Sequence, residues 1–419
     1  MKLTLTKQIS YLFVLITFFS VWKWVTIIPF NQYVVSAVQL LVIFLIILNR
    51  RRLFVKENAF KLLNLYLLWT LVCVIRGFVI SENYLEYKQL LIGFVGCVVP
   101  IVVWFFVSPQ RTSVSLNIWF RWSLLLMLLL VWFVGFSQYY LSPYLLLFCF
   151  IPLFKKKEIR LLVFAFAMVY IFYDTLNRSH IIKASIALLI AAYIKWGKLN
   201  TKLIRIGHTL GYLSTIALFA FVLTDATGLV TGKLDYQEAS KNNSIREERS
   251  KDTRSLILFD VVRSSIEHDY WLWGHTPARG YEITIGSDLF MDQYDDDRVF
   301  NKNERHRNEM VLTNIFTWEG LIGLILYTLV YMRCSFLAVY RSKNRFIPLL
   351  GCYIAFRWSF GWVEDVNCFY IMDISLWMMI AMCYSKQFRE MDDRAFVEWF
   401  NSLIGKRKAY ENSGLINRT

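Results

Sequence analysis

Hydrophobic residues recur along the chain in long runs that are separated by short polar segments. The runs are roughly twenty residues long, which is the length of helix that crosses a hydrocarbon layer about 30 Å thick. The segments Tyr33–Leu48 and 89–107 are examples. The pattern predicts twelve membrane spans, near residues 8–22, 32–49, 60–80, 89–107, 118–137, 141–154, 161–175, 181–195, 206–224, 309–332, 347–363 and 368–384.

The sixth predicted span, 141–154, is short and contains Pro143 and Pro152. A segment of this kind is expected to be tilted or broken, because proline interrupts the hydrogen bonds of a helix inside the membrane. A total of eleven or thirteen spans is therefore an alternative to twelve.

Composition narrows the class of protein. Of the 419 residues, 57% are hydrophobic and 18% are charged, whereas soluble domains carry about 25% charged residues. This excludes a soluble globular protein. The sequence predicts an all-α integral membrane protein with about twelve transmembrane helices and one large, partly helical extracytoplasmic loop.

The net charge of +15 arises mainly from basic clusters between the spans. These clusters recur after every second hydrophobic run, which is the positive-inside pattern of cytoplasmic loops. The pattern predicts cytoplasmic termini and gives no indication of nucleic-acid binding. The first run lacks a small-residue cleavage site and is expected to be a retained anchor. The clusters comprise Arg50, Arg51 and Arg52; Lys155, Lys156 and Lys157; Lys195, Lys198, Lys202 and Arg205; Arg341, Lys343 and Arg345; and Lys406, Arg407 and Lys408.

One long interruption divides the chain. Residues 225–308 are rich in charge, glycine and asparagine, and they are predicted to form the large extracytoplasmic loop. It separates transmembrane helices 1–9, in residues 1–224, from helices 10–12, in residues 309–384. Loops of this length are usually functional or disordered, and a folded cap over an active site is expected.

Local patterns predict structure in this loop and in the cytoplasmic tail. Thr253 is expected to cap a helix that has Phe259, Val262 and Ile266 along one face. Residues 274–280 are expected to form a tight turn at the membrane surface. The tail, 385–419, is predicted to contain an amphipathic interfacial helix with Phe396, Trp399, Phe400, Leu403 and Ile404 on its apolar side.

Charged residues inside the predicted spans gather toward the outer side. A charge in the hydrocarbon costs about 2.5–3.5 kcal/mol, so each is a candidate for function. The cations outnumber the anions, which predicts an outer polar cavity that prefers an anion. The alternative is purely structural pairing of Arg357 with Asp373 and of Lys183 with Asp174. The charges in the spans are Arg76, Lys183, Arg357, Asp174, Glu309 and Asp373, and Arg178 lies in the short outer loop between the seventh and eighth spans. The main exception on the inner side is Arg121.

Four short motifs lie within about residues 160–330. They are Asn177-Arg178-Ser179; Arg254 followed by Leu272-Trp273-Gly274-His275; His306-Arg307-Asn308-Glu309; and Glu319-Gly320-Leu321-Ile322-Gly323. In their residues, order and topology they resemble the motifs of the superfamily of O-antigen ligases and O-antigen polymerases. One departure is that Arg307 separates His306 from Asn308, whereas the family usually has histidine and asparagine adjacent.

The resemblance implies a bacterial glycosyltransferase of the inner (plasma) membrane that acts on glycans carried by polyprenyl pyrophosphate. Polymerisation of O-antigen, capsular or exopolysaccharide repeat units on the extracytoplasmic face is favoured over transfer to a lipid A core by a ligase. A transporter or flippase of lipid-linked glycans is a further alternative, which the large loop and the lack of internal repeats disfavour. The implied partners are the lipid-linked donor, a glycan acceptor and membrane lipid, with a chain-length regulator or flippase as a further candidate.

Particular residues suit this chemistry. Arg178, Arg254 and Arg279 are candidates to hold the departing phosphates, because a guanidinium matches phosphate with two parallel hydrogen bonds. His306 or Glu309 is the candidate base for the acceptor hydroxyl. Lys183, Arg307, Asn308 and Arg357 complete the predicted substrate contacts. The alternatives are a solvated helix-start charge for Arg254 and a polar residue at the helix entry for His306.

No metal or other cofactor is expected. The acidic run at residues 292–297 lacks the glycine and distal glutamate of a calcium loop and is interpreted as a solvated turn. The seven cysteines lie in or beside hydrophobic runs without a Cys-x-x-Cys pair, so no thiolate metal site is indicated. Glu319 lies about 15 Å along the helix from Glu309 at 1.5 Å per residue, which favours a packing role beside Gly320 and Gly323.

Overall fold

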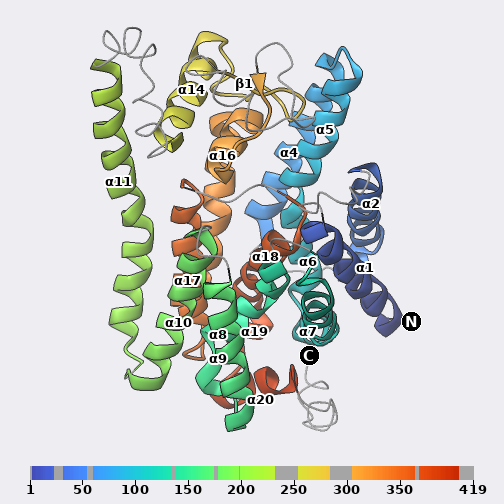
Figure 1. The fold of residues 1–419 in the computed structure, drawn as a ribbon, viewed down its shortest axis with the longest axis vertical. Coiled ribbons are helices and arrows are strands. Elements are labelled where there is room, and N and C mark those ends of the chain that lie inside the picture. Colours follow the sequence, from blue (N-terminus) through green and yellow to red (C-terminus); the bar gives the residue numbers. More distant parts are fainter. Residues whose placement is uncertain are drawn as a thin grey trace.

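The computed structural model describes residues 2–22, 32–53, 60–133, 137–173, 178–197, 199–231, 253–283, 304–363 and 368–404. Side chains are described for these residues except 2–4, 22, 32, 137–138, 178, 217–231 and 253–256. The described chain is almost entirely α-helical, and its longest helix, Thr201–Thr231, runs along the long axis of the molecule, whereas the N-terminal helix Lys2–Trp22 is inclined to that axis (Figure 1).

Each predicted hydrophobic range overlaps at least one helix of the structure, although the bounds differ and the helix Pro109–Leu130 begins nine residues before the predicted span 118–137. In chain order they are α1 (Lys2–Trp22), α2 (Gln32–Leu48), α3 (Arg50–Leu53), α4 (Lys61–Ile80), α5 (Tyr84–Cys97), α6 (Val103–Phe106), α7 (Pro109–Leu130), α8 (Leu145–Cys149), α9 (Lys157–Phe172), α10 (Arg178–Trp196), α11 (Thr201–Thr231), α14 (Thr253–Glu267), α16 (Val311–Tyr340), α17 (Ile347–Phe360), α18 (Ile371–Tyr384), α19 (Lys386–Glu390) and α20 (Asp393–Ser402). Short 3-10 segments are η2 (Val99–Val102), η3 (Ser137–Tyr144) and η4 (Ile151–Leu153), and the strands are β1 (Tyr281–Glu282) and β2 (Glu304–Arg305).

Five segments of the described chain are long and apolar enough to cross a membrane. They are Lys61–Ile80, Tyr84–Phe106, Pro109–Leu130, Ser179–Trp196 and Val311–Tyr340. Shorter apolar helices lie at Leu5–Val21, Tyr33–Leu48, Tyr139–Cys149, Ile347–Phe360 and Ile371–Tyr384. The predicted spans 161–175 and 206–224 are covered by α9 and α11. The helical class is therefore confirmed, and the five long apolar segments are compatible with an all-α membrane protein. The count of twelve spans stays a prediction.

The sixth predicted span is broken, as its prolines indicated. Pro143 lies inside η3 and Pro152 lies at the start of η4, with only the short helix α8 between them. A proline lacks the N–H that would continue the α-helical ladder, so the chain tightens into 3-10 turns around it. The segment is nevertheless part of the core, because Leu146, Phe148 and Cys149 are fully buried.

The tail helix α20 packs on the protein itself. Phe396, Trp399 and Phe400 are fully buried, and the Trp399 indole N–H donates to the Pro109 carbonyl at 3.1 Å. The Phe400 ring lies 4.7 Å from that of Phe154. The amphipathic helix predicted from the sequence is present, and its apolar face is covered by the chain's own aromatic side chains. The basic cluster at 406–408 lies outside the described residues.

Residues 253–283 and 304–310, called the cap below, lie at the end of the molecule opposite α20 (Figure 1). The helix predicted to begin at Thr253 is α14, and Ile257 and Val261 on its buried face pack with residues of the β1–β2 hairpin and its flanks. Val262 and Ile266, expected on the apolar face, are instead 42% and 66% exposed. The strands β1 and β2 pair antiparallel and join the two halves of the cap.

Candidate functional site

The central helix α16 is broken at Gly320, and the cap fills the break. Gly320 has φ +67° and ψ −170°, which interrupts the helical hydrogen bonds. The amide of Leu321 donates instead to the Trp271 carbonyl at 2.9 Å. On the other side of the break, the amide of His275 donates to the Thr317 carbonyl at 2.7 Å. The loop that follows α14 is thus joined by its backbone to the interior of α16.

Two glycines make this approach possible. Gly274 has φ +76°, a left-handed conformation that favours glycine, as does Gly320. A Cβ atom on Gly274 would lie 2.5 Å from the Gly320 nitrogen, and one on Gly320 would collide with the Leu272 carbonyl and the Gly274 nitrogen. The glycines of two separate sequence motifs therefore serve one purpose, which is close contact between the cap and the broken helix.

Glu319 joins the same break to α4. Its side chain is fully buried, and the Thr70 hydroxyl donates to its carboxyl Oε1 at 2.7 Å. The Trp69 indole N–H donates to the Glu319 carbonyl at 2.9 Å. A Cβ atom on Gly323 would approach Glu319 Oε2 at 2.8 Å. These contacts agree with the packing role expected for Glu319 beside Gly320 and Gly323.

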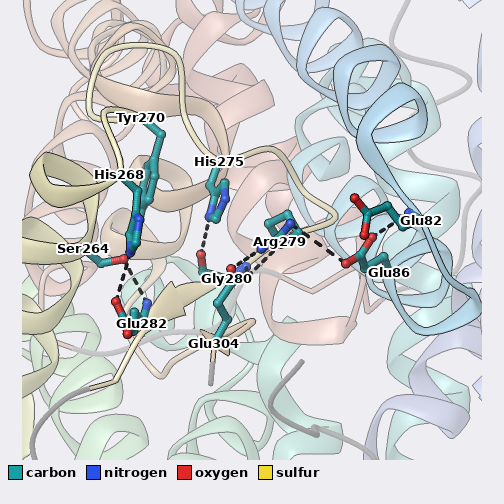
Figure 2. Close-up of polar contacts among 10 residues, drawn as sticks. All are labelled: Glu82, Glu86, Ser264, His268, Tyr270, His275, Arg279, Gly280, Glu282 and Glu304. Atoms are coloured by element: carbon teal, nitrogen blue, oxygen red, sulfur yellow. Dashed lines mark hydrogen bonds and ion pairs between the residues drawn. The ribbon is translucent and has the colours of Figure 1, made fainter. Parts of the chain in front are cut away.

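Arg279 lies between two carboxylates (Figure 2). Its Nε donates to Glu304 Oε2 at 2.9 Å, and Nη2 makes a second contact with the same carboxylate. Nη1 lies 4.0 Å from Oε1 of Glu86, a fully buried residue of α5. The hydrogen bond to Glu304 raises the pKa of Arg279. The predicted phosphate contact is thus occupied by carboxylates of the protein, and Arg279 instead holds the cap to α5.

His306 is turned into the cap. Its Nε2 donates to the Pro277 carbonyl at 2.9 Å, and its ring lies 5.2 Å from that of Trp318. The backbone carbonyl of His306 accepts from the Trp318 indole at 3.1 Å. Burial lowers the pKa of His306 to about 4. An imidazole with so low a pKa is a weak proton acceptor. This and the burial of the ring favour a positioning role for His306 over the predicted role as a base.

Asn308 and Glu309 have different surroundings. Asn308 braces the chain just before α16, because its Oδ1 accepts from the Met310 amide and from the Thr313 hydroxyl, each at 2.8 Å. Its backbone exchanges two further hydrogen bonds with the Asn314 side chain. Glu309 is 41% exposed and pairs with Arg305 at 2.8 Å. Glu309 is therefore the predicted base that faces solvent, whereas Asn308 holds the start of the helix.

Three predicted cations converge on the cap end of the helices. Arg307 donates to the Cys368 sulfur at 3.2 Å, just before α18. Arg357 is buried one turn before the end of α17, where the Gly361 carbonyl accepts from the first turn of α16. The Lys183 ammonium, also buried, lies 5.3 Å from the centre of the Phe360 ring. Positive charge from three separate segments thus collects beneath the cap.

The remaining predicted residues are only partly described. Arg178 begins α10 and Arg254 lies in the first turn of α14, but the described side chains do not include these two. Asp174 and the acidic run 292–297 lie outside the described residues. Within the part of the chain that the structure describes, no group of three or more His, Cys, Asp or Glu side chains is arranged to hold a metal ion.

Sequence reasoning missed the residues that anchor the predicted ones. Glu86 was visible as a glutamate in the first turn of a helix capped by Asn83, which accepts from the Glu86 amide at 3.0 Å, and the Glu86 side chain accepts from the Glu82 amide at 2.7 Å. Nothing in the local pattern indicated that it also faces Arg279. No local sequence pattern pointed to Glu304 or Thr70.

Comparison of the chain with protein-family models, curated proteins and solved structures finds no match.

Proposed function

We propose that this protein is a membrane glycosyltransferase that acts on polyprenyl-pyrophosphate-linked oligosaccharides and polymerises them. The observation that carries the proposal is the meeting of three of the motifs behind the O-antigen polymerase and ligase resemblance. Gly274, His306 and Gly320 belong to different motifs, yet all three lie where the cap meets α16. Transfer to another acceptor, as by a ligase, is the alternative.

The basic group beneath the cap suits the departing lipid pyrophosphate. Lys183 and Arg357 are buried in apolar helices at the cap end, and their positive charges would attract an anionic head group. Arg307 adds a cation at the same end, and Arg178 and Arg254 begin helices that the proposal places around the head group. Arg279 is left out of this set because Glu304 occupies its guanidinium.

The proposed reaction needs few groups. An acceptor sugar hydroxyl attacks the anomeric carbon of the donor, the bond from that carbon to the phosphate oxygen breaks, and the polyprenyl pyrophosphate leaves with the bonding electrons. The hydroxyl proton passes to a base, for which Glu309 is the candidate because it is exposed at the edge of the cap. His306 positions the loop from inside. Arg and Lys cations stabilise the leaving anion.

The test is reconstitution of the purified protein with synthetic lipid-linked repeat units. A ladder of products on a gel is expected for a polymerase, and it is expected to persist in EDTA. Arg178→Ala and Arg254→Ala are each expected to slow product formation by roughly 100–1000-fold, the usual cost of losing one preorganised donor. Arg263→Ala is the matched control on α14, since Arg263 pairs with the half-exposed Glu267.

The outcome distinguishes the alternatives. A single product formed only when a second glycan acceptor is added would favour a ligase. No product with either acceptor, while the protein remains folded, would refute the proposal. Loss of activity in EDTA with recovery on adding magnesium would instead make the acidic run 292–297 a candidate metal site.

A further inference from the structure

The cap segment 271–274 has all of its backbone carbonyls occupied by donors of the membrane helices. The carbonyls of Trp271 and Leu272 accept from the amides of Leu321 and Ile322, at 2.9 and 3.4 Å. The carbonyls of Trp273 and Gly274 accept from Arg76 of α4, at 2.6 and 3.2 Å. Four consecutive carbonyls outside regular structure are thus satisfied without water.

This segment lies well inside the length of an apolar helix. The Trp69 ring of α4 lies 5.6 Å from that of Trp273, and Trp69 is eleven residues before the end of the helix at Ile80. Eleven residues of helix correspond to about 16 Å at 1.5 Å per residue. The amides of Leu321 and Ile322 are the first donors after the break in α16 at Gly320. The loop therefore descends along α4 and meets α16 at its break.

Its two tryptophan side chains point outward. Trp271 is 43% and Trp273 is 51% exposed. On the same helix as Trp69, an apolar stripe at helical spacing is also exposed, with Leu68 at 57% and Ile75 at 56%. Because Trp273 packs on Trp69, its exposed ring continues this stripe.

We propose that residues 271–274 form a re-entrant segment whose tryptophans contact the acyl chains of the leaflet on the cap side. Irregular backbone is tolerated at membrane depth only where each polar group has a partner in the protein. A loop in water has no such requirement. The same reasoning explains why an arginine lies in the apolar helix α4. The Arg76 guanidinium donates two of the four hydrogen bonds that the carbonyls of residues 271–274 accept.

The partner is therefore lipid hydrocarbon, and the proposal does not depend on the enzymatic function. It is tested with a nitroxide spin label on single cysteines at Trp271→Cys, Trp273→Cys and, as a nearby control on the cap, His268→Cys, whose side chain is 51% exposed. The background carries Cys352→Ala, because the other six native cysteines are buried. Labelled protein is reconstituted into phosphatidylcholine vesicles.

Labels at 271 and 273 are expected to collide more often with oxygen, which concentrates in the acyl chains, than with a water-soluble nickel chelate. The label at 268 is expected to show the reverse. Nickel access at 271 and 273 equal to that at 268, or shielding of both labels from both quenchers, would overturn the proposal.

A second measurement covers the case in which a cysteine variant fails to fold. Vesicles with dibrominated acyl chains are expected to quench the tryptophan fluorescence of the unmodified protein more than that of the Trp271→Phe/Trp273→Phe variant. Equal fractional quenching of the two proteins would refute lipid contact.

Discussion

Replacing Arg279 with glutamine separates the structural role of this residue from the substrate contact predicted by its sequence. Glutamine keeps much of the side-chain length but removes the positive charge. In the folded protein it would leave the carboxylates of Glu304 and Glu86 without the cation between them (Figure 2). Glu86 is fully buried and the Glu304 side chain is only 11% exposed, so neither carboxylate regains full hydration.

The expected cost follows from this burial. Removing one partner of a buried ion pair typically destabilises a protein by about 3–5 kcal/mol. The lower end, about 3 kcal/mol, applies here because the Arg279 side chain keeps 16% exposure and its contact to Glu86 is long, at 4.0 Å. Since each 1.36 kcal/mol is a factor of ten, local opening of the cap should become about 100-fold more frequent.

Hydrogen–deuterium exchange of purified protein measures this opening. Peptides covering 275–283 and 304–310 are expected to exchange about 100-fold faster in Arg279→Gln, and adding Glu304→Gln should restore part of the protection. Arg263→Gln is the matched control in the same cap. Its partner Glu267 is 3.8 Å away and half exposed, so a loss of only about 0–1 kcal/mol is expected. Unchanged exchange in Arg279→Gln together with lost activity would refute the structural role.

Two further predictions concern the contact between the cap and α16. Gly320→Ala should weaken the docking of the cap by several kcal/mol or prevent it, because the alanine Cβ would overlap the Leu272 carbonyl and the backbone has a positive φ. Limited proteolysis of the cap measures this effect. Resistance to the protease equal to that of the wild type would contradict the prediction. Burial of neutral His306 depresses its pKa from the usual value of about 6.5 to about 4, so its contribution to stability is complete above pH 6.5 and is lost as pH falls toward 4. At pH 5.5 the loss of stability is about 1.4 kcal/mol relative to pH 8. Hydrogen–deuterium exchange measures this as a difference in the protection of residues 304–310 between the two pH values. That difference should be smaller in His306→Gln.

The membrane helices could be predicted because their signal is local. A run of apolar residues long enough to cross a bilayer identifies a helix without knowledge of its neighbours. The broken sixth segment followed in the same way from Pro143 and Pro152, since proline affects its own backbone. The helix at Thr253 was also predicted, but its face was not. Val262 and Ile266 are exposed because Ile257 and Val261 pack against the hairpin.

The candidate site was predicted as a set of residues and not as an arrangement. Charge and position along the spans identified Lys183 and Arg357, and the motif at the end of the large loop identified Arg307; all three lie at the cap end of the helices. The same reasoning named Arg279 for its guanidinium, but the neighbours of a guanidinium decide whether it is available. Its partner Glu86 lies on α5, far away in sequence, and only packing brings the two together.

The sequence by itself therefore determined the helical membrane class and the end of the molecule where charge collects, because hydrophobic length and the cost of buried charge act on each segment separately. Tertiary structure alone decided what the residues of the short motifs contact. It placed Gly274 against Gly320, turned His306 toward Pro277 and gave Arg279 to Glu304. These are contacts between segments distant along the chain, and their energies depend on distances and burial that exist only after the helices and the cap have packed.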